Sequence, residues 1–401
     1  MKNNKLLFFY FHLFAVLCLG SFAVGGITLR VISTTIMFLL LIRDKKFSCL
    51  KEICYLNFFI LFLFIMYLSL SFNGELLEFS FFKKFFAFYF VGIVTFLSIL
   101  RFVQDKVILK NTIFLLSVIC FSDAVLTVLQ FHNNNIGWNI GMLFGDISEF
   151  KDSLDVLDSS LGRSIVPGIF NGVVLNACRL AILLPLLYYI FSNSYSSLVK
   201  LLFGLSSIIV CYYAIYATQQ RTAFGISILF LFVFLFRFIH KNIKYILLFI
   251  GLAFIILPVV IDTLEQVDLG RLTKRDNEDR DVLHAIAQAY ILDNWLIGGP
   301  VKFQKVTGVS AHNLFYDALI FSGLFGFISL MLFHINIAIL SFKNIMLSYY
   351  NQRSSLFYLS FSMLIGLVYG CFHNTSFLTG EVLFFIIFAL MLKEKSWIKK
   401  S

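Results

Sequence analysis

Charged residues and proline are scarce in this chain. Asp, Glu, Lys and Arg make up 13% of its 401 residues, whereas a soluble domain has about 25%, and there are only 4 prolines. Hydrophobic residues make up 60% of the chain, and 51 residues are phenylalanine. This composition excludes a string of water-soluble domains. It predicts a polytopic membrane protein that lies in the lipid bilayer.

Signatures of metal and nucleotide chemistry are also missing. The sequence has no His-Glu-x-x-His, no Cys-x-x-Cys, no Gly-rich phosphate loop and no acidic cluster with metal-ligand spacing. The 7 cysteines are odd in number and form no such pair, so we interpret them as small apolar residues. We therefore expect no metal and no cofactor. The net charge of +10 comes from Lys and Arg scattered between apolar runs, which is typical of membrane topology and not of nucleic-acid binding.

The apolar runs predict an all-α fold, a single transmembrane domain over residues 1–401 with about twelve membrane-spanning helices. The expected spans are Leu6–Val24, Ile27–Ile42, Ile53–Phe72, Phe85–Leu100, Thr112–Phe131, Ile169–Phe191, Leu201–Ala217, Thr222–Phe236, Tyr245–Ile261, Leu324–Phe342, Ser354–Phe372 and Leu378–Leu392.

The distribution of positive charge predicts the orientation. With the N-terminus inside, 19 Lys and Arg fall on inside segments and 11 on outside segments, six of them in one long loop. Long loops cross regardless of charge, so the bias predicts that both termini are cytoplasmic. Two outside loops are long, an acidic one over residues 132–168 and a second over residues 262–323, in which we expect short helices. Because the other connections are short, we expect the functional site on this outer face.

The segment from Arg280 to Gly326 carries many of the chain's distinctive polar residues. Apolar residues recur at spacings of three and four after Arg280 and again after His312, which predicts two short amphipathic helices at a membrane surface. The two apolar sets are Val282, Ile286, Ala289 and Leu292, and Leu314, Ala318, Phe321 and Leu324. Arg280 and His312 are therefore expected near the starts of two helices.

This segment resembles the O-antigen polymerase and O-antigen ligase superfamily. The matching pattern is an Arg that opens a helix, a Gly-containing turn (here Trp295–Gly299), His312-Asn313, a short helix and Gly323-x-x-Gly326. A second match is Thr218-Gln219-Gln220-Arg221-Thr222-Ala223 at the start of a span. The resemblance covers the second half of the chain at motif level and the whole chain in topology. It implies a GT-C-like glycosyltransferase that needs no metal and works at the periplasmic face of the bacterial inner membrane.

Three arginines are candidates for binding a diphosphate, because a guanidinium stays charged and binds phosphate oxygens with two donors. Arg221 lies at the outer end of a span, where the alternative is an interfacial arginine that extends to water. Arg280 lies in a mixed-charge run that otherwise indicates a solvated face, and the family position singles it out. Arg179 lies inside a span; it either serves function or pairs with a carboxylate such as Asp123 or Glu381.

His312 is the candidate catalytic residue. Its ordinary pKa of about 6.5 lets it accept a proton from a sugar hydroxyl near neutral pH, and the alternative is a capping or hydrogen-bonded interfacial histidine. Asn313 is expected to cap the following helix. Asp317 is expected either to orient His312, to bind sugar or to lie at the surface. His284, one turn after Arg280, is a weaker alternative base.

These residues predict transfer of a glycan from undecaprenyl diphosphate to an acceptor hydroxyl, with inversion at the anomeric carbon. The short stretch Pro300–Ala311 leaves little room for a lipid A–core acceptor, which favours an O-antigen polymerase that extends surface polysaccharide on lipid-linked repeat units. The O-antigen ligase is the alternative. A polysaccharide transporter or flippase is less favoured, since the sequence shows neither broken helices nor pairwise repeats. The expected partners are the undecaprenyl-diphosphate-linked oligosaccharide and the bilayer; the resemblance admits a chain-length regulator protein.

Overall fold

The computed structural model describes residues 2–20, 22–24, 26–44, 52–132, 134–144, 166–169, 173–193, 198–239, 278–351, 354–373 and 375–398. These residues are almost all helical, as expected; their one sheet is a short antiparallel hairpin of β1 (Ala23–Val24) and β2 (Ile27–Thr28). The helices are α1 (Lys2–Cys18), α2 (Leu29–Ile42), η1 (Cys54–Leu56), α4 (Asn57–Phe72), α5 (Phe81–Lys84), η2 (Phe85–Tyr89), α6 (Phe90–Phe102), α7 (Lys106–Phe131), α8 (Asn135–Phe144), α10 (Val173–Ser192), α11 (Leu198–Ala217), α12 (Arg221–Ile239), α14 (Glu278–Asn294), α15 (Pro300–Thr307), α16 (Leu314–Ser348), α17 (Ser355–Phe372), η4 (Phe377–Thr379) and α18 (Val382–Ile398).

The described helices support a multi-pass membrane protein, but their lengths do not give twelve full crossings. Six are long and apolar enough to cross a membrane: Cys54–Phe72, Phe81–Phe102, Lys106–Phe131, Val174–Ser192, Leu314–Ser348 and Ser355–Phe372. Four apolar helices are shorter: Asn4–Cys18, Leu29–Ile42, Leu202–Ala217 and Arg221–Phe236. The expected span Tyr245–Ile261 lies outside the described residues, and each of the other expected spans overlaps a helix.

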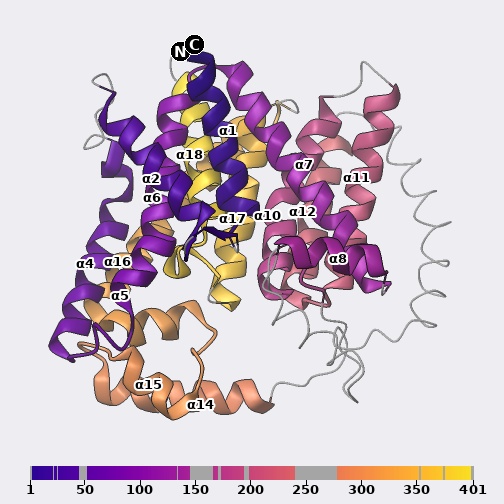
Figure 1. Cartoon of the computed structure of the whole chain (residues 1–401). Helices are drawn as coiled ribbons and strands as arrows, with labels where there is room; N and C mark the ends of the chain where they lie inside the picture. Colours follow the sequence, from indigo (N-terminus) through magenta and orange to yellow (C-terminus); the bar gives the residue numbers. More distant parts are fainter. Residues whose placement is uncertain are drawn as a thin grey trace.

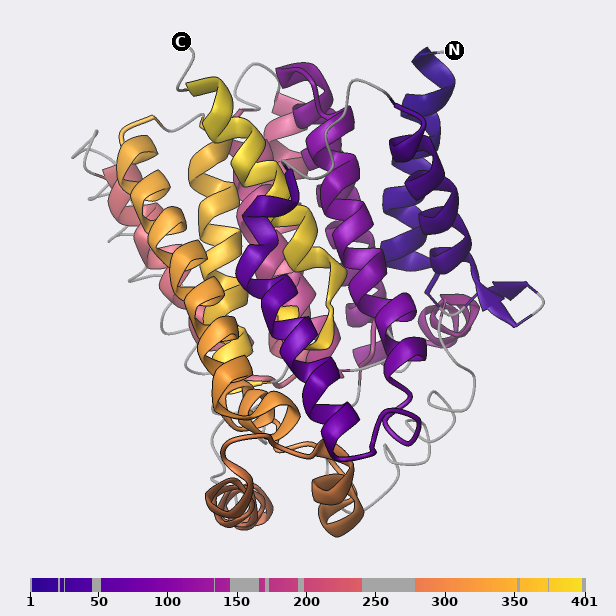
Figure 2. The same ribbon diagram turned by 90° about the vertical axis from the view of Figure 1, so that its left-hand side faces the viewer.

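The helices form a bundle with two distinct ends. Both chain termini lie at one end, which we call the terminal end (Figure 1). At the opposite end, the distal end, α14 and α15 lie across the ends of the long helices (Figures 1 and 2). These two helices belong to the segment 262–323, of which residues 262–277 lie outside the described part of the chain. α8 belongs to the segment 132–168, of which residues 133 and 145–165 also lie outside it.

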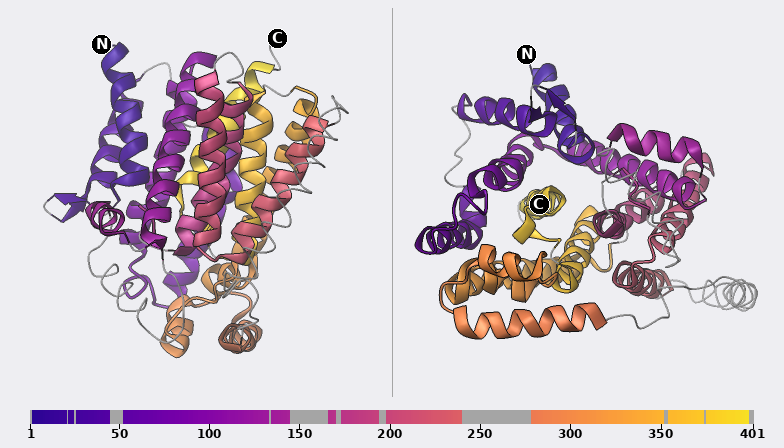
Figure 3. Two further views of the ribbon diagram at one scale, coloured as in Figure 1. Left: turned by 90° about the vertical axis from the view of Figure 1, so that its right-hand side faces the viewer. Right: turned by 60° about the horizontal axis from the view of Figure 1, so that its bottom comes forward.

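The helix α18 lies in the centre of the bundle, surrounded by the other helices (Figure 3). Every residue from Val382 to Met391 is buried. The expected span Leu378–Leu392 is wrong in its first turn, because Gly380 has a left-handed φ of 71° and ends η4. Phe377, which is completely buried, contacts the rings of Phe333 at 4.8 Å and of other core phenylalanines. The chain therefore re-enters the bundle after α17, and α18 begins in its interior.

Candidate functional site

Two motifs that are separate in the sequence pack directly against each other at the distal end. The Gly-containing turn (Trp295–Gly299) follows α14, and Gly323 interrupts α16 with φ 61° and ψ −167°. The N–H of Leu324 donates to the carbonyl of Trp295 over 2.8 Å. A Cβ on Gly323 would overlap the carbonyl oxygen of Leu296, so this contact requires glycine. The expectation that the chain has no broken helix is therefore wrong at this position.

Two side chains that sequence reasoning did not single out anchor α14 and α15. The buried carboxylate of Glu75 accepts from the backbone N–H groups of Val301 (3.1 Å) and Lys302 (3.2 Å) at the start of α15, where a negative charge is favourable. The hydroxyl of Tyr290 on α14 donates to the carbonyl of Gly299 over 2.6 Å. Burial, and then the charge of Glu75, raise the pKa of Tyr290 to about 12. Glu75 has no local signal, because its partners lie more than 200 residues further along the chain.

His312 is exposed and has an unusual backbone conformation. Its φ of 53° lies in the left-handed region, which non-glycine residues rarely adopt and which is enriched at functional sites. The completely buried carboxylate of Asp317 accepts from the N–H of Ala311 over 2.8 Å and closes the turn that carries His312. The side chain of Asn313 caps α16 by accepting from the N–H of Phe315 over 2.9 Å. Asp317 thus does not lie at the surface, and it acts on the backbone around His312.

Arg221 is the exposed first residue of α12. The residue two positions earlier, Gln219, also has a left-handed φ, 52°. Among the described residues, three non-glycine residues have a positive φ: Ser80, Gln219 and His312. Two of the three, Gln219 and His312, lie in the two segments that the sequence analysis singled out.

Arg221 and the turn that carries His312 lie toward the same end of the bundle. The antiparallel helices α12 and α17 contact each other through the rings of Phe230 and Phe361, 5.2 Å apart. Arg221 lies nine residues before Phe230 on α12, and Cys371 lies ten residues after Phe361 on α17, so both lie on the distal side of this contact. The carbonyl of Cys371 accepts from the side chain of Asn313 over 3.5 Å. The C-terminal end of α17 therefore contacts the segment that carries His312.

Arg280 and His312 each lie one helical turn before a contact that joins α14 and α16. The ring of His284 on α14 contacts the ring of Tyr316 on α16 at 5.2 Å, and the side chain of Gln288 donates to the Tyr316 hydroxyl over 2.6 Å. One helical turn before that contact lie Arg280 on α14 and His312 just ahead of α16. The expected helix after Arg280 is thus present. Only the backbone of Arg280 is described, so its side chain lies outside the described part of the structure.

The apolar face expected on α14 is not the face that packs on the protein. Val282 and Leu292 of that face are exposed, 60% and 77% respectively. The residues that pack are instead Leu283, Ala287 and neighbours on the same side of the helix. Both the exposed and the packed residues of α14 recur at spacings of three and four, so either set fits the pattern of an amphipathic helix. The contacts that α14 makes with Tyr316 decide which of the two faces is buried.

Arg179 is paired with a carboxylate inside the bundle. Its Nε donates to the Glu381 carboxylate over 2.9 Å, and a second nitrogen lies 2.7 Å from the same oxygen. A third contact goes to the carbonyl of Leu17 at 3.3 Å. The other suggested partner, Asp123, instead accepts from the N–H of Ile169 over 2.8 Å. Of the two carboxylates considered from the sequence, Glu381 is thus the partner.

A second arginine, Arg30 on α2, lies near this pair, and the sequence analysis did not select it as a site residue. Its guanidinium lies 5.0 Å from the centre of the Phe88 ring. It also lies within electrostatic range of Glu381 and Arg179. Two arginines therefore share one nearby glutamate. The sequence signal was its position inside the expected span Ile27–Ile42, where a charge is costly.

No group of three or more His, Cys, Asp or Glu side chains that could hold a metal ion is found among the residues that the structure describes. No family model matches the chain, and no curated protein matches it. The chemistry of the distal end must therefore be argued from its own residues. It offers an exposed imidazole, an exposed arginine and the helix start that carries Arg280, on a layer fixed by buried hydrogen bonds.

Proposed function

We propose that this protein transfers a glycan from undecaprenyl diphosphate to an acceptor hydroxyl, at the distal end of the bundle and on the periplasmic side of the bacterial inner membrane. Within this class we favour the O-antigen polymerase, with the O-antigen ligase as the alternative. The observation that carries the proposal is that His312, the α14 turn that carries Arg280, and Arg221 all lie toward the distal end.

In the proposed reaction, the imidazole of His312 accepts the proton of the acceptor hydroxyl as that oxygen bonds to the anomeric carbon. The bond from this carbon to the diphosphate oxygen breaks, so the sugar inverts and the lipid diphosphate leaves. Arg221 and Arg280 bind the diphosphate, whose negative charge grows as it leaves. Asn313 and Asp317 position His312 through the backbone. Arg179 stays a substrate-binding candidate from inside the bundle.

The test is complementation of a deletion strain at matched membrane abundance, read as surface polysaccharide on a gel. His312→Ala should reduce polymer by about 100-fold or more, the usual contribution of a positioned general base. Arg221→Lys and Arg280→Lys should each cost about 10-fold, because a point charge cannot replace the two-donor contact. A core-plus-one-repeat band in the deletion strain identifies a polymerase. Bare core with long chains still on the carrier lipid identifies a ligase.

His284→Ala is the matched control, because His284 lies on the same layer, one turn away from the proposed site. It should retain polymer. Full polymer in the His312→Ala strain, or equal loss in the control, would show that His312 is not the specific proton acceptor. The proton acceptor would then have to be another group.

A transporter of lipid-linked glycans is the second candidate, because three features favour it. The helix α16 is broken at Gly323, the chain re-enters the bundle before α18, and the Arg179–Glu381 pair lies in the interior. Broken helices and interior charges are typical of transporters. A deletion strain that accumulates lipid-linked repeat units on the cytoplasmic side, with bare core and no long chains on the carrier, would favour this candidate.

A further inference from the structure

Arg30 is a partly buried arginine whose guanidinium has no hydrogen-bond acceptor in the part of the chain that the structure describes. It lies in the first turn of α2, directly after the hairpin of β1 and β2, of which residues 21 and 25 lie outside that part. Its Nε is buried without a partner. A buried donor without an acceptor is unfavourable, and a buried charge more so. Arg30 therefore indicates an acceptor that comes from outside the chain.

The backbone of Arg30 is fixed by contacts with three helices. The hydroxyls of Ser33 and Thr34 donate to the Arg30 carbonyl over 3.1 and 2.7 Å. The ring of His12 on α1 is completely buried and bonds to the hydroxyls of Ser33 on α2 (3.2 Å) and Thr95 on α6 (3.1 Å). These bonds join α1, α2 and α6 one turn from Arg30. The guanidinium thus extends from a rigid base.

The groups around this guanidinium compensate its charge poorly. The ring of Phe88 lies 5.0 Å from it, a favourable contact for a cation but a weak one. The charged groups that act on Arg30 are Glu381 and Arg179. The carboxylate of Glu381 is already bound to Arg179, at 2.7 and 2.9 Å. Asp123 is a further carboxylate that acts on Arg179. Arg30 therefore keeps a positive charge without a bonded counter-ion.

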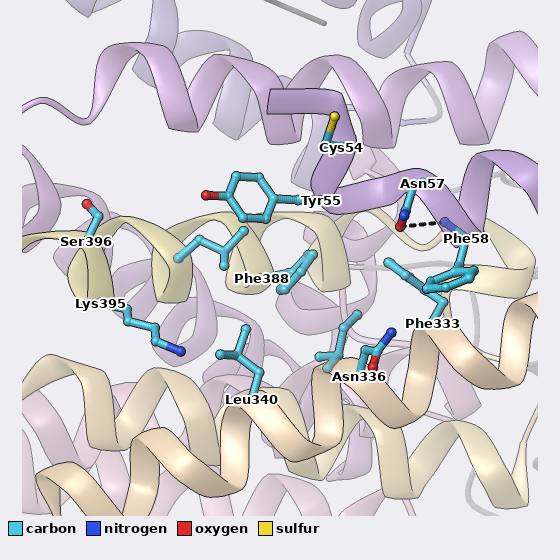
Figure 4. Close-up of a pocket in the computed structure, with 12 residues that line it drawn as sticks. Cys54, Tyr55, Asn57, Phe58, Phe333, Asn336, Leu340, Phe388, Lys395 and Ser396 are labelled. Atoms are coloured by element: carbon cyan, nitrogen blue, oxygen red, sulfur yellow. Dashed lines mark hydrogen bonds between the residues drawn. The ribbon is translucent and has the colours of Figure 1, made fainter. Parts of the chain in front are cut away.

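Other basic side chains beside apolar parts of the bundle have partners. Arg101 on α6 pairs with Asp44. Lys395 lines a groove of about 370 Å³ between α4, α16 and α18 (Figure 4), and it already takes part in another interaction. The absence of a bonded partner at Arg30 is therefore not a general property of the basic residues in this fold.

A ligand can reach Arg30 from the flank of the bundle. Arg30 is partly exposed, and the ring of Phe88 beside it is 39% exposed. Phe22, whose carbonyl accepts from the N–H of Leu29, is also 39% exposed. A guanidinium binds phosphate oxygens with two parallel donors. A cation with exposed aromatic rings near it therefore suits an anion that carries an apolar chain.

We propose that Arg30 anchors a binding site for the phosphate group of a membrane lipid, on the flank of the bundle between the β1–β2 hairpin and η2. The phosphate oxygens accept from the guanidinium, and the apolar chain lies against Phe88 and Phe22. The lipid is either a phospholipid of the bilayer or a prenyl diphosphate. Both offer the same phosphate chemistry, and the experiment below separates them. The site does not depend on the proposed transferase activity.

The test uses the purified full chain in nanodiscs of phosphatidylcholine, to which phosphatidylglycerol or farnesyl diphosphate is added as the probe. Native mass spectrometry counts the probe molecules that stay bound. Arg30→Gln should weaken binding of at least one probe by about 10-fold or more, the usual loss when a charge-assisted hydrogen bond is removed. The probe whose binding depends on Arg30 identifies the lipid. Monodisperse elution establishes that each variant is folded.

Arg30→Lys separates binding from a structural role and serves as the test if Arg30→Gln does not fold. A lysine still places a cation beside Phe88 but lacks the two parallel donors, so this variant should also lose binding. Arg43→Gln is the matched control, because Arg43 is an exposed arginine at the other end of α2. It should bind both probes like the wild type. Unchanged binding of both probes in Arg30→Gln or in Arg30→Lys, or an equal loss in Arg43→Gln, overturns the proposal.

Discussion

At the scale of single residues, the left-handed backbone of His312 has a cost that its neighbours offset. A non-glycine residue in this conformation costs about 1–2 kcal/mol. The buried carboxylate of Asp317 and the cap formed by Asn313 fix the backbone on both sides of it. Buried contacts that hold a strained backbone indicate that the direction of the His312 side chain is required. The same geometry at Gln219, just ahead of Arg221, indicates the same requirement at the start of α12.

The Arg179–Glu381 pair permits a test that separates stability from function. Both side chains are less than a tenth exposed, so Glu381→Leu leaves a buried charge and should destabilise the protein by about 3–5 kcal/mol. The double variant Arg179→Leu/Glu381→Leu should recover most of that loss, as measured by thermal unfolding in detergent. If Arg179 also binds substrate, the stable double variant is inactive. An active double variant shows that the pair is structural only.

At the scale of elements, the break in α16 and the turn after α14 form one unit. The sequence predicted a helix start at Arg280, a turn at Trp295–Gly299 and a helix after His312, and all three are present. It could not predict that the turn docks into the break at Gly323. That contact depends on backbone atoms brought together by the tertiary fold, and no side-chain pattern records it.

Gly323→Ala should therefore disrupt the distal layer, and Gly308→Ala is its matched control. Both glycines have a positive φ, 61° and 74°, so alanine costs about 1–2 kcal/mol at either position. Only at Gly323 does the added Cβ also overlap a backbone oxygen; nothing lies within 4 Å at Gly308. Protease cleavage at the Trp295–Gly299 turn should rise sharply in Gly323→Ala and little in Gly308→Ala. Equal cleavage would contradict the docking role.

The contact between α14 and the Gly-containing turn should depend on pH through Tyr290. Its pKa is raised from the ordinary 10.0 to about 12 because burial and Glu75 disfavour the phenolate. The fold thus favours the protonated form, so the stabilisation is complete below pH 10 and is lost as the pH rises through about 12. The fluorescence of Trp295, with Trp138 and Trp397 replaced by Phe, should change over this range. Tyr290→Phe should remove the change in fluorescence. If the change persists in this variant, another group causes it.

At the scale of the whole molecule, the hydropathy of the sequence predicted the positions of the helices well. It did not predict where every helix begins within the bundle. The apolar run Leu378–Leu392 predicts a span, yet α18 begins in the interior because the chain turns at Gly380. Phe377 and Leu378 are apolar for a different reason, since they fill the core around the re-entrant turn. Burial within a bundle and exposure to lipid both select apolar residues, so the composition does not separate them.

The orientation of the bundle across the membrane can be tested at its two ends. Val306 on α15 is 74% exposed at the distal end, and Tyr350, beyond the C-terminal end of α16, is 68% exposed toward the terminal end. The charge bias predicts that the distal end is periplasmic. With Cys49, the exposed Cys54 and the half-buried Cys371 replaced by Ser, Val306→Cys should react with an impermeant thiol reagent in cells whose outer membrane is opened. Tyr350→Cys should react only after the inner membrane is also opened. The reverse pattern would place His312 on the cytoplasmic side and would exclude the proposed function, which requires a site at the periplasmic face.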